Sequence, residues 1–286
     1  MGEKLAVRFS RSVSELVRAR RSPRSYRPEP IAEAAARELE AAAGSLDRGL
    51  AAEPARFALV RWTDEARREV RLGDYGIISR PRNFLVGAIR ESDTAHISYG
   101  YLLEQLVLKA TDLGLGTCWL GYFDPRFTGE FKPGPGELMP AVCVVGPTAE
   151  NPGIKDRLVR SVVGATRRRN WSDLFWDGKP GTPLSPDAAG PYAEPLEMVR
   201  LSPSAGNAQP WRVVRESGSA NFHFFLKPVN ARYEQRRIHD VDVGIAMCHF
   251  ELSCRELGLA GAWTRSAPGV EAPPGARHIF TWQPAP

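Results

Sequence analysis

An arginine-rich segment near the start of the chain has the residue types to bind a phosphate. It runs from Arg18 to Arg27, RARRSPRSYR, and holds five arginines in ten positions. Each guanidinium presents several N–H donors in a fixed plane, so such a run suits a phosphate group. The alternative interpretation is a solvated basic arm or a nucleic-acid patch.

Two further segments could contact a polar, flat ligand. Leu201 to Trp211 reads LSPSAGNAQPW and puts hydroxyl and amide groups and a flexible glycine in one short loop. Gly114 to Pro125 reads GLGTCWLGYFDP, and its turn at Gly121 can aim backbone N–H groups at a ring. For Leu201 to Trp211 the alternative interpretation is a turn that ends a helix. The segment Gly114 to Pro125 is weak evidence when taken alone.

The motifs of several other chemistries are missing from the sequence. Gly114-Leu115-Gly116 lacks the third glycine of a dinucleotide fingerprint, because Trp119 stands there. Neither a P-loop nor a G-x-S-x-G sequence occurs. The histidines and cysteines lack metal-ligand spacing, so we expect no metal site, and we can name no catalytic residue.

Hydrophobic patterning and turn residues predict a mixed α+β chain rather than a regular alternation of strands and helices. The predicted helices are Ser12 to Arg20, Ile31 to Ala43 with Gly44 as its C-cap, Thr94 to Leu113, Ala193 to Leu201 and Val241 to Leu257. The predicted strands are Arg56 to Trp62, Phe84 to Ile89, Met139 to Val145, Trp211 to Arg215, Asn221 to Leu226, Gly261 to Arg265 and His278 to Trp282.

The two long predicted helices belong to an internal repeat. Tyr99 to Trp119 and Val243 to Trp263 share six of 21 positions at a shift of 144 residues. We interpret this as evidence of two related halves. The alternative is that both segments share a common supersecondary arrangement, a helix that ends in Gly-Leu before a strand. We divide the chain into a first half at 1–165, a loop-rich connection at 166–195 and a shorter second half at 196–286.

Composition describes an ordinary globular chain. Hydrophobic residues make up 43% and charged residues 25%, and the formal net charge is +5. No apolar run approaches the ~18 residues of a membrane span. The N-terminus lacks the apolar stretch of a signal peptide, and the four cysteines fit reduced thiols. We expect a cytoplasmic protein that does not bind a membrane.

Taken together, the three segments resemble the hallmark segments of the nitroreductase family of flavin enzymes. The resemblance covers most of the chain and implies a nitroreductase-like fold with FMN as cofactor. One departure concerns order, because the Ser-Pro-Ser loop follows the arginine segment by some 180 residues rather than by about one helix. The position where the family has its Ser-Pro-Ser loop, about one helix after the arginine segment, holds AAAGSLDRGLAAEPARFALV instead. The chain therefore resembles a tandem, fused member.

Family members are homodimers in which each FMN site takes segments from both subunits. Here the first half keeps the Arg-Arg-Ser and Gly-Leu-Gly segments, and the second half keeps the Ser-Pro-Ser loop. The resemblance thus implies one composite site per chain, with the other site lost. The chain would be a pseudo-dimer, and we expect a monomer whose two long helices pack as pseudo-two-fold mates.

The resemblance also implies roles for individual residues. Arg20, Arg21 and Ser22 would hold the FMN phosphate. Arg24 would approach the pyrimidine edge of the ring, and backbone N–H groups near Gly121 would face its N5 and O4 atoms. Tyr122 stands where many members have glycine. The implied cofactor-binding residues are Arg20, Arg21, Ser22, Arg24, Gly121, Tyr122, Arg167, Arg169, Ser202, Pro203, Ser204, Asn207 and Gln209, and which two of Arg167, Arg168 and Arg169 meet the phosphate stays open.

The implied function is an FMN-dependent oxidoreductase that passes a hydride from NAD(P)H to an electron-poor small molecule. Nitroaromatic compounds and quinones are both acceptors of this kind. The alternatives are a flavin-binding storage or sensing protein without turnover, and a nucleic-acid binder that uses its basic segments. We expect no nucleic-acid partner. The aromatic stretch Asn170 to Leu184 suggests either a cover over the flavin or a set of core anchors.

Overall fold

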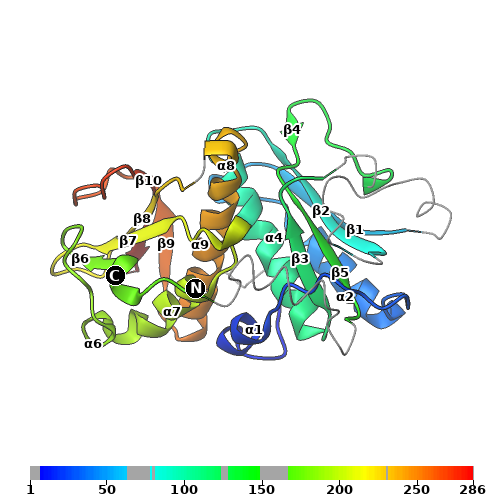
Figure 1. Ribbon diagram of the computed structural model, residues 1–286, viewed down its shortest axis with the longest axis horizontal. Coiled ribbons are helices and arrows are strands. Elements are labelled where there is room, and N and C mark those ends of the chain that lie inside the picture. Colours follow the sequence, from blue (N-terminus) through cyan, green and yellow to red (C-terminus); the bar gives the residue numbers. More distant parts are fainter. Residues whose placement is uncertain are drawn as a thin grey trace.

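Two five-stranded sheets lie at opposite ends of the molecule, with two long helices between them (Figure 1). The computed structural model describes residues 7–62, 78, 81–123, 128–148, 167–229 and 231–285. Within these residues, no helix has the length and apolar character needed to cross a membrane. The predicted mixture of helices and strands is confirmed.

The first sheet comes from the first half of the chain. Its strand order is β1-β2-β5-β3, with β4 paired to β2, and these pairings are antiparallel. The predicted strand at Met139 to Val145 begins only at Val142, since Pro140 lacks an N–H for the ladder. The described elements of this half are α1 (Val13–Ala19), α2 (Glu33–Gly44), β1 (Ala55–Arg61), β2 (Asn83–Arg90), α4 (Ala95–Asp112), β3 (Gly116–Leu120), β4 (Glu137–Leu138) and β5 (Val142–Gly146).

The second sheet has the order β6-β7-β8-β10-β9, and β6 pairs parallel with β7 while the other pairs are antiparallel. Apart from three short 3-10 turns, the elements of this half are β6 (Phe175–Asp177), α6 (Pro186–Ala189), α7 (Ala193–Leu201), β7 (Trp211–Arg215), β8 (Phe222–Leu226), α8 (Ala231–Gln235), α9 (Ile238–Glu256), β9 (Gly261–Thr264) and β10 (Arg277–Pro284).

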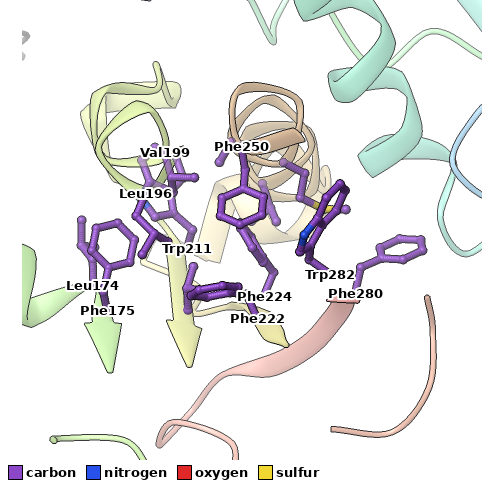
Figure 2. Packing of buried hydrophobic residues seen from close by; sticks show 14 of the residues in the cluster. Leu174, Phe175, Leu196, Val199, Trp211, Phe222, Phe224, Phe250, Phe280 and Trp282 are labelled. Atoms are coloured by element: carbon purple, nitrogen blue, oxygen red, sulfur yellow. The ribbon is translucent and has the colours of Figure 1, made fainter. Parts of the chain in front are cut away.

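An aromatic core joins the second sheet to the helices that cover it. Trp211 and Phe222 rise from the sheet toward Leu196 on α7 and Phe250 on α9 (Figure 2). All four side chains are fully buried. This packing fixes α7, and with it the polar loop that follows α7, relative to α9.

The stretch from 167 to 195 is more ordered than the predicted loop-rich connection. It supplies β6 to the second sheet, and Leu174, Phe175 and Leu184 belong to the aromatic core. Trp171 packs against that core and donates its Nε1–H to the Leu184 carbonyl. Phe175 and Trp171 are therefore core anchors, and no described residue of 170–184 lines the cavity presented below, so the structure favours core anchors over a flavin cover. The boundary at 165 lies outside the described residues, so the domain division stays a proposal.

Helices α4 and α9 cross at a pair of glycines. A Cβ on Gly100 would lie 2.2 Å from the Val241 carbonyl oxygen, and one on Gly244 would lie 2.0 Å from the Ile97 carbonyl oxygen. Only glycine permits so close an approach of two backbones. Gly100 and Gly244 are matched positions of the internal repeat, so the crossing has pseudo-two-fold symmetry, as the sequence predicts.

The same symmetry extends to the ends of both helices. After α4, Leu115 N–H donates to the Ala110 carbonyl across Gly114, whose φ is +74°. After α9, Leu259 N–H donates to the Cys254 carbonyl across Gly258, whose φ is +73°. Each is a Schellman motif, which needs a left-handed residue after the helix. The chain thus consists of two related halves fused as a pseudo-dimer.

Candidate functional site

The loop after α7 is held in an unusual conformation. Gly206, Asn207 and Gln209 all have positive φ, at 58°, 54° and 49°. Left-handed backbone is uncommon outside glycine and concentrates at ligand-binding loops. Two hydrogen bonds hold this one: Gln209 N–H donates to Ser204 Oγ at 2.9 Å, and Ala205 N–H donates to Asp242 Oδ1 at 3.0 Å.

The first half has a counterpart of this loop. Leu50 N–H donates to Ser98 Oγ at 3.0 Å, and Ser98 matches Asp242 at the shift of 144 residues. Glu53 occupies this counterpart, with its carboxylate accepting from Ser98 Oγ at 3.0 Å and from Ala51 N–H at 3.0 Å. The first-half loop is thus satisfied by the chain's own carboxylate.

Arg20 ends α1 and is buried, with 7% of its surface exposed. Its Nη1 donates to Ser22 Oγ at 3.1 Å, while its Nε has no hydrogen-bond partner among the described residues. Burial lowers the pKa of Arg20, and the nearby Glu104 carboxylate opposes that shift. A buried guanidinium with an unused donor indicates a place where an anion is expected.

Arg168, in the connection between the halves, approaches the same region. Its guanidinium donates to Asn207 Oδ1 at 3.0 Å and to the Leu201 carbonyl at 3.2 Å. Burial lowers its pKa to about 10, with further lowering from the positive charges of Arg20, Arg200 and Arg21. The guanidinium groups of Arg20, Arg21, Arg168 and Arg200 are therefore close enough to repel one another, and a bound phosphate would relieve that repulsion.

The predicted Arg167 and Arg169 contact the loop through their backbones. The Arg167 carbonyl accepts from Asn207 Nδ2 at 2.8 Å, and Arg169 N–H donates to Gln209 Oε1 at 2.8 Å. In this trio it is the Arg168 side chain that lies beside the loop. Arg21 folds back, donating to the carbonyls of Arg18 and Arg20.

A cavity of about 230 Å³ opens beside this cluster, and both halves line it. Of the predicted residues, Ser22, Arg24, Gly121, Tyr122, Pro203 and Ser204 line it directly. Its other described lining residues are Ile78, Cys118, Trp119, Leu120, Pro140, Ala141, Ala205, Gly206, Tyr233, Ile238, Val241, Asp242 and Ile245. Ser22 connects the two regions, because it lies on the cavity wall and accepts from Arg20.

Ser202 lies behind the cavity rather than in it. Its side chain is fully buried, and its Oγ lies 3.1 Å from the Met198 carbonyl oxygen and 2.8 Å from His249 Nδ1. Glu104 Oε1 is 2.9 Å from His249 Nε2, and Glu104 Oε2 accepts from Trp119 Nε1 at 2.9 Å. This chain of hydrogen bonds joins the cavity wall at Trp119 to the start of the polar loop.

The residues that sequence reasoning missed come from the start of α9 and the short α8. Asp242 lines the cavity, and burial raises its pKa against the opposing effect of His239, whose Nδ1 is 2.9 Å away. The helix predicted from Val241 begins three residues earlier, at Ile238, after Arg237 in a left-handed conformation. The repeat was the available signal, because it matches Asp242 with Ser98.

The structure also bears on the other chemistries. The described residues contain no group of three or more His, Cys, Asp or Glu side chains that could hold a metal ion. All four cysteines are buried with free thiols. Arg18 pairs with Glu194 at 2.9 Å and Arg20 is buried, so part of the arginine segment is packed into the fold rather than solvated.

Comparisons with known proteins agree with this geometry. Residues 12–254 match the family described as "Putative TM nitroreductase". The crystal structure of a "putative nitroreductase" of Thermotoga maritima superposes with a TM-score of 0.60 at 18% identity, covering 99% of this chain and 98% of that chain. The chain therefore belongs to this nitroreductase family and has its fold.

Shorter structures align with about half of the chain. A nitroreductase family protein of Clostridium difficile gives a TM-score of 0.36 at 16% identity, covering 52% of this chain and 91% of that chain. A nitroreductase with bound FMN from Bacteroides fragilis gives 0.37 at 17% identity, covering 50% and 91%. A comparison with curated proteins found no match.

Proposed function

We propose that the protein is an FMN-dependent oxidoreductase with one composite site per chain. The observation that carries the proposal is a cavity lined from both halves, next to a buried Arg20 whose Nε has no partner among the described residues. Family membership supports an oxidoreductase, and relatives such as the Bacteroides fragilis protein bind FMN.

The arginine cluster fits the phosphate of such a cofactor. Arg20, Arg21 and Arg168 would neutralise the phosphate, with Ser22 and Asn207 beside them. Charge-assisted hydrogen bonds of this kind are each worth about 1.5–3 kcal/mol. Arg168, rather than Arg167 or Arg169, is the side chain we propose from that trio, because it already lies between Asn207 and the Leu201 carbonyl.

The cavity fits the ring system. Arg24 would place its positive charge at the pyrimidine edge, where reduction builds negative charge. Backbone N–H groups at Gly121 and Tyr122 would donate to the opposite edge, and Pro203 and Ser204 would close the site from the second half. When bound, the flavin would supply the redox chemistry, and the protein would supply position and electrostatic field.

NAD(P)H is the donor we propose, and an electron-poor small molecule is the acceptor. The chain has no dinucleotide fingerprint, which agrees with a donor that binds at the flavin site itself. Buried free thiols are typical of a reducing compartment, which supports a cytoplasmic location.

The visible spectrum of the purified protein, followed by NAD(P)H oxidation assays, tests the proposal. We expect flavin absorbance, or its appearance after FMN is added, and NAD(P)H oxidation that depends on a quinone or nitroaromatic acceptor. Failure to bind FMN would refute the proposed cofactor. Bound flavin without turnover would instead identify a storage or sensing protein.

A further inference from the structure

A second cavity continues the first one past Gly121 and Pro140. It has a volume of about 300 Å³, and the described residues that line it are Gly121, Phe123, Met139, Pro140 and Arg236. Gly121 and Pro140 line both cavities. Among these described residues Arg236 is the charged one, and the others have apolar side chains or are glycine.

Arg236 is held in place by an aromatic ring. Its guanidinium carbon lies 4.5 Å from the ring centroid of Tyr122, and that of Arg232 lies 4.9 Å from the same centroid. Tyr122 is in turn 6.2 Å from Tyr233, centroid to centroid. Stacking on a ring orients the plane of a guanidinium and leaves its N–H edge available to an anion.

The charge of Arg236 is not neutralised within the described residues. It forms no hydrogen bond or ion pair there, and its guanidinium stacks on the Tyr122 ring. The neighbouring Arg237, by contrast, pairs with Asp240 at 2.8 Å, and Arg277 pairs with the same carboxylate at 2.7 Å. Among the described residues, Arg236 is thus a guanidinium of the second cavity that an incoming ligand can pair with.

We propose that this second cavity selects a planar acceptor that carries an acidic group. The ring of the acceptor would lie against Phe123, Met139 and Pro140, and its carboxylate would accept from the guanidinium of Arg236. Planar bidentate pairing with a carboxylate is the geometry that arginine provides best. This inference rests on the proposed function, because it names the substrate class of the same site.

The test compares 4-nitrobenzoate with its uncharged analogue 4-nitrobenzamide, which has nearly the same shape. Calorimetric binding to the oxidised holoprotein without any electron donor gives the acid-to-amide affinity ratio, and steady-state rates give the ratio of kcat/KM. Arg236→Met removes the charge and keeps the chain length. Arg265→Met is the matched control, because Arg265 is exposed and lines neither cavity.

We expect Arg236→Met to lower affinity and kcat/KM for the acid about tenfold, as loss of one exposed charge-assisted contact predicts. The amide should change less than twofold, and Arg265→Met should change neither ratio. Higher salt should reduce the preference of the wild type for the acid.

Equal acid-to-amide ratios in the wild type and Arg236→Met would overturn the inference. The same holds if Arg236→Met raises KM for NADPH but not NADH and leaves the acid-to-amide ratio unchanged, because Arg236 would then recognise the donor's phosphate. The calorimetric ratio does not depend on turnover. Absence of turnover would therefore count against the proposed function, while this inference is decided by the binding ratio.

Discussion

The most informative side chain near the cavity is that of Arg20, whose charge is buried and only partly offset by nearby groups. Arg20 is buried, its Nε has no partner among the described residues, and burial lowers its pKa. Burying a charge is costly unless it is paired. A bound phosphate would supply the missing partner, so the cost in the free protein becomes affinity for the ligand.

We predict that Arg20→Met weakens FMN binding at least tenfold and changes the unfolding free energy of the flavin-free protein by less than about 1 kcal/mol. Stability changes little because the desolvation of Arg20 and its attraction to Glu104 oppose each other. Flavin titration and denaturant unfolding measure the two effects.

Arg18→Met is the control for this prediction, because Arg18 is an exposed neighbour that pairs with Glu194, and its loss should leave FMN affinity unchanged. Unaltered FMN affinity in Arg20→Met would contradict the proposed role of Arg20.

The buried hydrogen bonds of Glu104 to His249 and Trp119, which join the two halves, lead to a second prediction. Glu104→Gln should lower the unfolding free energy by about 1–3 kcal/mol, because one amide NH₂ must then face His249 or Trp119 Nε1–H in place of an acceptor oxygen. Glu33→Gln, at an exposed pair with Arg61, should change it by less than about 0.5 kcal/mol. A Glu104→Gln variant as stable as the wild type would show that these hydrogen bonds contribute nothing.

Sequence reasoning located the segments of the site better than its side chains. Ser22, Arg24, Gly121, Tyr122, Pro203 and Ser204 line the cavity, because short segments with turn residues present most of their polar groups to one side. Ser202 turned inward, since the serine that ends α7 packs onto α9 through His249. Asp242 could not be found from its own segment, because its placement depends on where α9 crosses α4.

Helices α4 and α9 depend on two glycines at their crossing. We predict that Gly244→Ala lowers the unfolding free energy by at least about 2 kcal/mol, because its Cβ would lie 2.0 Å from a backbone oxygen that cannot rotate away. Gly44→Ala is the control. Nothing lies within 4 Å of a Cβ there, and the helical position should gain up to about 1 kcal/mol. Equal stability of the two variants would contradict the close crossing.

The ends of these helices predict a pH dependence. Burial and the positive charge of Arg237 lower the pKa of His96, at the start of α4, to about 4. In the unfolded chain the same imidazole takes up a proton near pH 6.5. The unfolded state therefore binds more protons as the pH falls from 6.5 toward 4, and stability is lost over that range.

His96→Gln should make the slope of unfolding free energy against pH shallower between pH 6.5 and 5. This window lies above the range in which carboxylates with lowered pKa, such as Glu53 and Glu137, contribute. His278, whose burial lowers its pKa to about 4, should give a similar effect when replaced. An unchanged slope in His96→Gln would show that folding does not shift the pKa of His96.

Helices and strands were predictable from the sequence where local residue patterns mark them. Both long helices were found because apolar spacing and a glycine after the last turn mark them. The strand in the stretch 167–195 is not predictable from composition, since its glycines, prolines and polar residues resemble a loop, and only the sheet shows that Phe175–Asp177 pairs with β7. Pairing between distant segments is a tertiary effect that local composition does not encode.

The two halves of the chain are arranged like the two subunits of a dimer. The two sheets stand at opposite ends, and the crossing helices bury each other between them (Figure 1). Because that interface is already covered, we propose that the chain is a monomer. The first-half loop is filled by Glu53, whereas the second-half loop faces the cavity, which supports one site rather than two.

Native mass spectrometry of the FMN-reconstituted protein can decide whether each chain forms one composite site, because it reports assembly and cofactor number together. A single composite site within one chain predicts one 31.5 kDa chain carrying one FMN, and the same species after dilution. A stable dimer that loses FMN as it dissociates, or a chain that carries two FMN molecules, would contradict the single composite site.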